Sequence, residues 1–323
     1  MSRRPAISFV AFVAILCAPA PAPASQGSAL PYETGRADFN LKFKGMKNPY
    51  NTFAIYLLPN ELVSFDLDPK PRSAWRLEGD LTASCSKDFS LTWTAPKVPG
   101  LYHIRIHHPD VGDSMSLNVF VMVPSSNVKN GYLNGYRIGD YPKIPLKNLK
   151  IYEAPRGFIE VTQENEKTLV SPHFNIGQFL CHQEGGSPKY VVVKEKLVLK
   201  LELILRKTNE AGIHCGTFNI MSGYRTPYYN KSIGNVKYSR HVYGGAADIF
   251  IDADPLNGVM DDLNHDGEID YRDAAVLYDI VDVLYGKPFY EHFLGGLARY
   301  RKTQNHGPFV HVDVRGFRAR WGD

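Results

Sequence analysis

Alternating apolar and polar positions run through much of the first 125 residues. Residues 90–94 (SLTWT), 102–107 (YHIRIH) and 116–124 (SLNVFVMVP) alternate or are rich in β-branched and aromatic side chains. Successive side chains of a strand point to opposite faces, so this pattern predicts strands with one buried face. Short strands at this spacing, with a turn at Pro99 and Gly100, predict an N-terminal β-sandwich.

Farther along the chain, apolar residues recur with the period of a helix. One face of residues 193–205 and one face of residues 271–285 are apolar, and a glycine follows each segment. These patterns predict two amphipathic helices that pack against a core. Other short runs predict a helix at residues 174–181 and strands at residues 158–162, 218–221, 246–251 and 309–315.

The change of pattern predicts two folded parts. We expect a β-sandwich domain at residues 28–125, a Gly- and Pro-containing linker at 126–165 and an α+β domain at 166–323. The second domain is expected to contain a small antiparallel sheet with flanking helices. A length of 323 residues, with 44% hydrophobic and 22% charged residues, fits an ordinary globular chain with two domains.

Two stretches near the end of the chain contain side chains of the kind that bind metals. They are residues 239–248 (SRHVYGGAAD) and 306–313 (HGPFVHVD), which include His241, Asp248 and His311. Zinc takes imidazole nitrogen and carboxylate oxygen, and a catalytic zinc with three protein ligands keeps a position for water. The alternation of residues 309–315 places His311 on the strand face opposite the valines. We therefore expect a zinc hydrolase site.

Two further side chains are candidates for the chemistry. His306 precedes the last strand through a Gly-Pro turn, and its imidazole is suited to transfer protons. Arg225 follows a short strand, where its planar guanidinium could hold a carboxylate or a developing negative charge. From the residue alone, a structural salt bridge of Arg225 with Asp248 or Asp313 is an equally good interpretation.

These motifs resemble a known enzyme family. S-x-H-x-x-G-x-A-x-D is present at residues 239–248, H-x-x-x-x-H-x-D at 306–313 and SGYRTP at 222–227. Together they resemble the zinc D-Ala-D-Ala carboxypeptidases and murein endopeptidases, which cut peptidoglycan stem peptides or cross-links. The resemblance covers roughly the last half of the chain, and it implies a DD-peptidase/hedgehog-like fold for that part.

The resemblance also implies roles position by position. It implies that one catalytic zinc is bound by His241, Asp248 and His311. It implies that His306 is the catalytic acid/base and that Arg225 offsets negative charge on the substrate or transition state. Further candidates for contacts with the ligands or the substrate are Ser239, Tyr224 and Asp313.

Residues 262–273 (DLNHDGEIDYRD) have the spacing of an EF-hand calcium loop and resemble a single dockerin-type repeat. The turn glycine is Gly267, and the last position has Asp in place of Glu. The expected ligands of one structural Ca²⁺ are Asp262, Asn264, Asp266, Glu268 (through its carbonyl), Asp270 and Asp273. The alternative is an acidic loop in solvent. His265 occupies an outward position and is not expected to bind zinc.

The first 25 residues predict a secretory signal peptide, because a basic start precedes an apolar run and a segment of small residues. The apolar run is too short to span a bilayer, so we expect an exported protein of the periplasm or cell envelope. In that setting Cys181 and Cys215 could form a disulfide, or Cys85, Cys181 and Cys215 could all be buried thiols.

The sequence thus predicts a secreted zinc metallopeptidase that acts on peptidoglycan peptides. The net charge of +4 is mild, and no Lys/Arg cluster is dense enough to predict binding to nucleic acid. The alternative function is a non-catalytic cell-wall binding module that depends on zinc or calcium. His306 argues against that alternative, since a pure binding site needs no acid/base. Protein partners and oligomeric state stay open.

Overall fold

The computed structural model describes residues 31–322 except 74, 76, 80–82 and 86–89. The predicted signal peptide, residues 1–25, lies outside the described residues. None of the described helices has the length and apolar character needed to cross a membrane.

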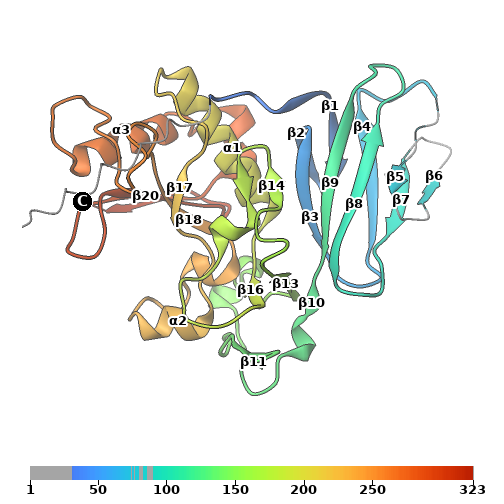
Figure 1. The fold of residues 1–323 in the computed structure, drawn as a ribbon, viewed down its shortest axis with the longest axis horizontal. Helices are drawn as coiled ribbons and strands as arrows, with labels where there is room; N and C mark the ends of the chain where they lie inside the picture. Colours follow the sequence, from blue (N-terminus) through green and yellow to red (C-terminus); the bar gives the residue numbers. More distant parts are fainter. Residues whose placement is uncertain (1–30, 74, 76, 80–82, 86–89, 323) are drawn as a thin grey trace, which may run out of the picture.

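The N-terminal part consists of two β-sheets (Figure 1). The first has the order β2 (Met46–Tyr50), β1 (Arg36–Phe43), β4 (Leu62–Asp68), β7 (Leu91–Thr94) and β6 (Ala83–Cys85). The second has the order β3 (Thr52–Leu57), β9 (Ser114–Val121), β8 (Gly100–His107) and β5 (Leu77–Gly79). Their alternating apolar residues, such as Phe53, Phe65 and Trp93, are fully buried, as the period-two pattern predicts.

The predicted strands at residues 90–94, 102–107 and 116–124 correspond to β7, β8 and β9. Figure 1 shows the two sheets beside each other. The β-sandwich assignment stays a prediction, because the segments that flank β6 lie outside the described residues. The domain boundaries at residues 28–125, 126–165 and 166–323 also stay predictions.

Short elements connect the N-terminal sheets to the rest of the chain. A three-stranded sheet has the order β10 (Val123–Pro124), β13 (Gly157–Val161) and β16 (Lys189–Val191). Two small hairpins pair β11 (Tyr132–Leu133) with β12 (Tyr136–Arg137) and β14 (Leu169–Ser171) with β15 (Phe174–Asn175). Single 3-10 turns form η1 (Ser125–Asn127), η2 (Leu146–Asn148), η3 (Lys150–Tyr152) and η4 (Ile176–Phe179).

The helix predicted at residues 174–181 is wrong in extent, because the structure has β15 followed by the single turn η4. Asn175 and Gln178 explain the short turn. The Asn175 side chain accepts the backbone N–H of Gln178, and the Gln178 side chain accepts that of Asn175. The chain is extended again at Leu180, so the turn does not continue as a helix.

A five-stranded sheet forms the centre of the C-terminal part. Its order is β17 (Asn219–Ser222), β18 (Ala246–Phe250), β20 (Phe309–Asp313), β19 (Gly296–Tyr300) and β21 (Ala319–Gly322). The first four strands are antiparallel, as predicted, but β21 pairs with β19 in parallel. The sheet is therefore mixed at one edge. The part is α+β, with several small sheets and few helices.

Helices and turns flank this sheet. They are α1 (Glu195–Glu210), α2 (Pro227–Ser232), α3 (Tyr271–Asp282), η5 (Arg240–Tyr243) and η6 (Pro288–Phe293). The predicted helices at 193–205 and 271–285 correspond to α1 and α3. Figure 1 shows α1 between the C-terminal sheet and the N-terminal strands, and α1 contacts both β3 and α3.

The hydrophobic core is continuous between the N-terminal and C-terminal parts. Polar contacts cross the same boundary: Lys44 Nζ lies 2.9 Å from Glu195 Oε1, and the Asn118 side chain donates to the carbonyl of Leu169. Helix α1 thus contacts strand β3 of the second sheet and the turn between β1 and β2, so packing fixes the position of the C-terminal part relative to the N-terminal part.

Cys181 and Cys215 are buried free thiols. Burial raises the pKa of the Cys215 thiol to about 12, so it packs as a small apolar side chain. Of the two alternatives left open by the sequence, the structure has buried thiols at Cys181 and Cys215 and no disulfide between them. The side chain of Cys85 lies outside the described residues.

Candidate metal centre

The two central strands of the C-terminal sheet bring the predicted metal ligands together. Asp248 on β18 and His311 on β20 are direct cross-strand partners, so their side chains leave the sheet on the same face. His241 comes from η5, which ends at Gly244 with φ +62°. A Cβ atom at Gly244 would lie 2.3 Å from the carbonyl oxygen of Val192, so this tight turn requires glycine.

Among the described residues, His241, Asp248 and His311 are grouped so that one atom of each could hold a metal ion, and all three are buried. His241 Nε2 lies 3.2 Å from His311 Nδ1 and 3.2 Å from Asp248 Oδ1. His311 Nδ1 and Asp248 Oδ1 lie 2.8 Å apart. Ligand atoms at zinc distances of about 2.0–2.1 Å in a tetrahedron are roughly 3.3 Å apart. The three atoms therefore fit one triangular face of a tetrahedral zinc site.

The other ring nitrogen of each imidazole is bound elsewhere. Nδ1–H of His241 donates to the carbonyl oxygen of Gly223 at 2.7 Å, and Nε2–H of His311 donates to Asp313 Oδ2 at 3.2 Å. In these tautomers of the neutral rings, Nε2 of His241 and Nδ1 of His311 are the nitrogens that a metal ion would use, and both face Asp248 Oδ1. Such bonds fix the tautomer and orientation of histidine ligands in metal sites.

Asp313 is itself held firmly. Its carboxylate accepts the backbone N–H of Gly296 at 2.8 Å and the guanidinium of Arg315, and the residue is fully buried. A Cβ atom at Gly296 would lie 2.4 Å from Asp313 Oδ2, so glycine lets the carboxylate approach the backbone. From α1, Lys200 Nζ donates to the backbone carbonyl of Asp313 at 2.7 Å. Asp313 therefore orients His311, as expected for a residue next to a ligand.

Burial and the charges of neighbouring side chains shift the pKa values of His241, Asp248 and His311. Burial lowers the pKa of His241. Burial also opposes the charged form of His311, but in that form both ring N–H groups donate hydrogen bonds, to Asp248 and to Asp313, and these bonds outweigh burial and raise the pKa. Burial would raise the pKa of the Asp248 carboxyl, but the two imidazoles hold it well below its usual range. Asp248 is thus an anion, the form that binds a cation.

Arg225 forms a salt bridge with Asp248, which is one of the two interpretations that the sequence left open. Its Nη2 lies 2.6 Å from Asp248 Oδ2, and its Nε donates to Ser222 Oγ at 2.8 Å. This bond occupies the second carboxylate oxygen of Asp248 and leaves Oδ1 facing the imidazoles. Arg225 also lines the cavity beside the cluster, so its assignment to substrate charge stays a prediction.

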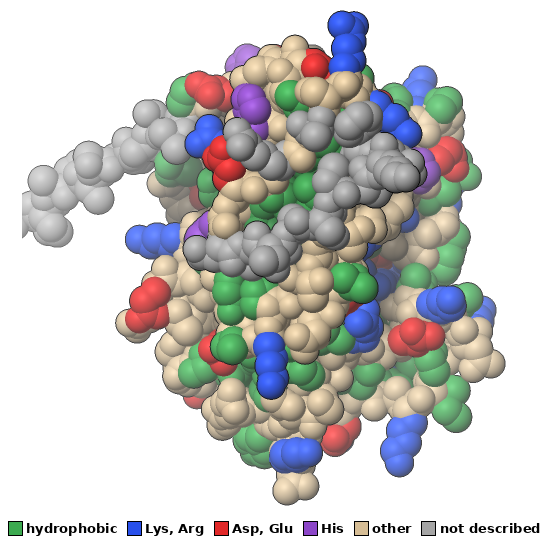
Figure 2. Space-filling view, turned by 90° about the vertical axis from the view of Figure 1, so that its right-hand side faces the viewer, with side chains coloured by type: hydrophobic (Ala, Val, Ile, Leu, Met, Phe, Trp, Pro, Cys, Tyr) green, Lys and Arg blue, Asp and Glu red, His purple; other side chains and the backbone are tan. Residues whose placement is uncertain are grey.

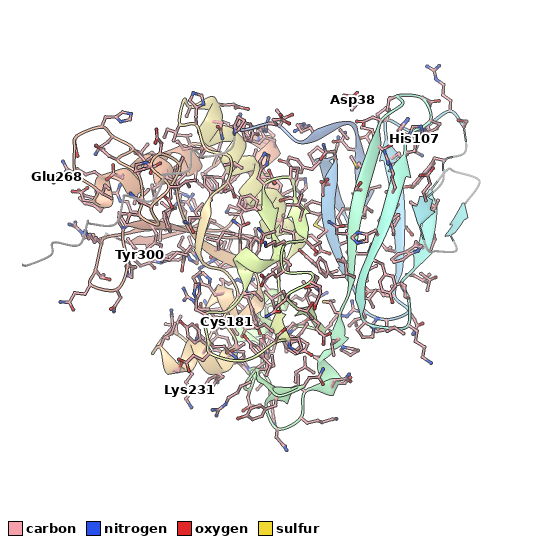
Figure 3. The ribbon with its side chains drawn as sticks, viewed as in Figure 1. Asp38, His107, Cys181, Lys231, Glu268 and Tyr300 are labelled. Atoms are coloured by element: carbon pink, nitrogen blue, oxygen red, sulfur yellow. The ribbon has the colours of Figure 1, made fainter. Side chains whose placement is uncertain are left out.

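The cluster lies at a cavity of about 450 Å³. Ser239, one of the predicted contact residues, lines it together with Arg225 and the three ligands. Figure 3 labels Tyr300, which also lines it, on the opposite side of the molecule from His107 of the N-terminal sheets. The cavity is large enough for several residues of a peptide, which fits a binding cleft.

Sequence reasoning missed most of the aromatic and cationic lining of this cavity, which comes from scattered positions: Tyr152, Tyr238, Arg240, Tyr300, Arg315 and Trp321. Arg240 occupies the middle position of S-x-H, so the motif itself offered a signal. It is buried against the rings of Tyr152 and Tyr243, and its Nη1 donates to the carbonyl of Ile151. The other positions have no such signal.

Besides the buried Asp313, two residues predicted for the zinc site are absent from the cavity lining: His306 and Tyr224. His306 is half-buried in the loop before β20, with its Nδ1–H donating to the carbonyl of Gly307 at 2.8 Å. Its ring centroid is 5.0 Å from that of Phe309, which does line the cavity. Tyr224 is buried, and its hydroxyl lies 2.8 Å from that of Tyr141. Tyr224 is thus packed in the core, and His306 contacts a residue of the cavity lining without belonging to the lining.

The acidic side chains of the predicted calcium loop form hydrogen bonds and ion pairs with other groups of the protein. Asp262 accepts the backbone N–H groups of Asp266 and Gly267, while Asp273 accepts those of Leu263 and Asp270. The guanidinium of Arg272 forms ion pairs with Asp266, Glu268 and Asp270. Asp270 also caps α3. Among the described residues, the oxygens of this loop do not gather into a metal-binding group, so calcium binding stays a prediction.

Comparison with known proteins bears on the segment that contains the first part of the site. No curated protein matches the chain. Residues 172–267 match the model of the family described as Peptidase M15. The matched segment includes His241 and Asp248 but ends before His311, which the fold supplies through β20. This match supports placing the C-terminal part among the M15 zinc peptidases.

Proposed function

We propose that the protein is a zinc peptidase that hydrolyses peptide bonds in peptidoglycan stem peptides or cross-links, as a carboxypeptidase or an endopeptidase. The observation that carries this proposal is the triangle formed by His241 Nε2, Asp248 Oδ1 and His311 Nδ1 at the wall of a cavity. The match to the Peptidase M15 family supports a peptide substrate. Peptidoglycan is the substrate that the wider set of motifs implies.

In this proposal His241, Asp248 and His311 would hold the zinc ion. When bound, zinc supplies a Lewis acid that polarises the scissile carbonyl and activates water. Asp313 keeps the imidazole of His311 in the tautomer that presents Nδ1 to the metal. Arg225 orients Asp248 and places a permanent positive charge at the cavity wall, where negative charge develops during amide hydrolysis.

The acid/base role assigned to His306 is part of the proposal. The ring of His306 contacts that of Phe309, which lines the cavity, so His306 lies close to the cavity without being part of its lining. Digestion of purified muropeptides by the zinc-loaded protein, followed by mass spectrometry, tests both the activity and this role. We expect the wild type to release products and His306→Ala to lose at least about 100-fold in rate while retaining zinc.

A matched control is His182→Ala, which removes an exposed histidine outside the cavity and should leave the rate unchanged. Unchanged release by His306→Ala would remove the assigned role from His306. The masses of the products also distinguish a carboxypeptidase, which removes a terminal residue, from an endopeptidase, which separates cross-linked peptides.

A second candidate function is a wall-binding module that keeps the metal but does not turn over substrate. The observation that favours it is the position of His306, which the described cavity lining does not include. The same digestion separates the two functions. Retention of muropeptides by the zinc-loaded wild type without any change in their mass would support the binding module and contradict the peptidase.

Export to the periplasm or cell envelope belongs to this proposal, because peptidoglycan lies outside the cytoplasmic membrane and the first 25 residues have the pattern of a signal peptide. A structural calcium ion in residues 262–273 is a further part. It is supported by the spacing of the oxygen side chains and by the left-handed backbone at His265 and Gly267, which turns the loop.

A further inference from the structure

A second large cavity, of about 850 Å³, lies between the first N-terminal sheet and α1 with η6. We call it the basic groove. It shares no lining residue with the cavity at the metal centre. The strands β1 and β2 form one wall, and α1 and η6 form the other. The groove is thus built at the junction of the N-terminal and C-terminal parts.

The charged side chains that line the groove are all positive among the described residues. No Asp or Glu belongs to the described lining. The cationic lining residues are Arg36, Lys42, Lys44, Lys47, Lys196 and Arg206. By contrast, Figure 2 views the outer side of the N-terminal sheets, where positive and negative side chains are scattered over the surface. Cations concentrated in a hollow attract anions more strongly than scattered charges do.

Carboxylates outside the lining neutralise only part of this charge. Lys42 and Lys47 share the single carboxylate of Asp68 at 3.3 and 2.9 Å, with half of each lysine side chain exposed. Lys44 pairs with Glu195. Lys44 also donates to the carbonyl of Tyr56 at 2.6 Å, so it is held by the protein. The two pairs with Asp68 are exposed and therefore weak, so Lys42 and Lys47 keep the capacity to bind an anionic ligand.

The opposite wall has further unsatisfied cationic groups. Nε of Arg206 is buried and has no hydrogen-bond partner, although the side chain pairs with Glu210 at 3.5 Å. Lys196 is partly exposed at the same wall. The Arg206 side chain is 29% exposed, so the outer part of its guanidinium can pair with an anion in the groove.

Apolar side chains lie between the cations. Phe289 on η6 is about half exposed, and Leu199, Leu203 and Phe293 also line the groove. Sugar rings have apolar faces that pack on aromatic rings, and their acidic substituents pair with Lys and Arg. Nucleic acid would require several exposed aromatic platforms for successive bases, whereas Phe289 and the imidazole of His292 are the exposed rings among the described lining residues.

From these observations we infer that the basic groove binds an anionic glycan chain, that is, a saccharide polymer bearing carboxylate or phosphate groups. Binding there would hold the protein on a polyanionic polymer while the cavity at the metal centre stays open. This inference goes beyond the proposed peptidase function, and it does not depend on the metal centre.

The test is binding of the full-length, folded protein to fluorescently labelled polygalacturonate and to a labelled glycerol phosphate–saccharide polymer, followed by anisotropy at low and high salt. We expect binding to at least one polymer, weakened by salt, and no binding to neutral dextran. Which polymer binds identifies carboxylate or phosphate as the recognised group. Binding to neither would overturn the inference.

Variants locate the binding. Lys42→Gln/Lys47→Gln/Lys196→Gln removes three groove cations and should weaken binding at least tenfold. The matched control, Lys97→Gln/Lys129→Gln/Lys167→Gln, removes the same charge from exposed positions outside the groove and should change the affinity less than twofold. If the groove variant fails to fold, Arg36→Gln at the exposed start of β1 replaces it, with Lys97→Gln as control.

Equal weakening by the groove variant and its control would overturn the inference, because the effect would then come from net charge alone. Tighter binding of a single-stranded oligonucleotide than of either glycan would also overturn it and identify nucleic acid as the ligand class. Zinc content and peptide release should be the same in the groove variant and the wild type, so this test is independent of the proposed peptidase.

Discussion

Asp313 supports the metal centre without being one of the three grouped ligands. It accepts Nε2–H of His311 and is held by Gly296 and Arg315. We predict that Asp313→Asn lowers zinc affinity by about 10–100-fold, because His311 loses the charged partner that orients its ring and raises its basicity. Competition with a chelating dye measures this affinity. Asp282→Asn, an ion-paired aspartate on α3, is the control. An equal affinity for both variants would contradict the assigned role.

The residues of the metal centre divide into those that the sequence predicts and those that it does not. His241, Asp248 and His311 were predictable because metal ligands are restricted to a few residue types and the motif fixes their spacing. Ser239 and Asp313 lie within the same motifs. Tyr152 and Trp321 come from a connecting turn and the last strand, and only the folded sheet brings them beside the ligands.

At the scale of elements, the loop of residues 262–273 connects β18 to α3 through hydrogen bonds of its own side chains. Asp273 is fully buried and accepts backbone N–H groups from both ends of the loop. The capping box between Asp270 and Asp273 starts α3. The loop is therefore ordered by protein contacts, and calcium would have to compete with Arg272 for Asp266 and Asp270.

We predict that calcium stabilises the folded protein through this loop. At a hundredfold excess over Kd, a ligand that binds only the folded state contributes about 2.7 kcal/mol, which raises Tm by roughly 4 °C in a protein of this size. Thermal melting with Ca²⁺ and with EDTA measures the shift.

Asp262→Ala/Asp266→Ala should abolish the calcium-dependent shift, because both carboxylates belong to the predicted ligand set. The absence of a shift in the wild type, or the same shift in this variant, would assign residues 262–273 to an acidic loop without a cation.

Secondary structure was predictable where periodicity was strong and less so where local hydrogen bonds decided the outcome. The apolar faces of α1 and α3 and the alternation of β20 identified those elements correctly. The segment at 174–181 has apolar residues at helical spacing, but Asn175 and Gln178 close a single turn. The parallel pairing of β21 with β19 depends on contacts distant in sequence, which a local pattern does not contain.

At the scale of the whole molecule, His173 connects the start of the described chain to α1. Its Nδ1 lies 2.7 Å from Glu202 Oε2, and its Nε2 donates to the carbonyl of Glu33 at 2.7 Å. Burial would lower the pKa of His173, but the hydrogen bond and charge of Glu202 outweigh it and raise the pKa above 6.5. Folding therefore favours the protonated imidazole.

A histidine whose pKa is raised by folding stabilises the protein fully below its unfolded pKa, and this contribution is lost as pH rises through the folded pKa. We predict that the free energy of unfolding of the wild type falls, relative to that of His173→Gln, as pH increases from 6 to 9. Denaturant unfolding at several pH values measures the difference. A constant difference across this range would contradict a protonated His173 in the folded state.

The division into an N-terminal β-rich part and a C-terminal α+β part could be predicted because the hydrophobic period changes along the chain. The contacts between them could not. Lys44 and Glu195 are 151 positions apart, and neither has a local signal that predicts their ion pair. The basic groove arises from the same juxtaposition of β1, β2, α1 and η6, so a linear pattern of charge does not reveal it.

The zinc content of the purified protein tests the central claim most directly, since the proposed function depends on one cation bound by His241, Asp248 and His311. After loading with zinc and dialysis, inductively coupled plasma analysis should find about one zinc per chain in the wild type and in Asp282→Ala. Asp248→Ala should retain almost none. A wild type without zinc, or an Asp248→Ala variant with a full equivalent, would contradict the assigned metal centre.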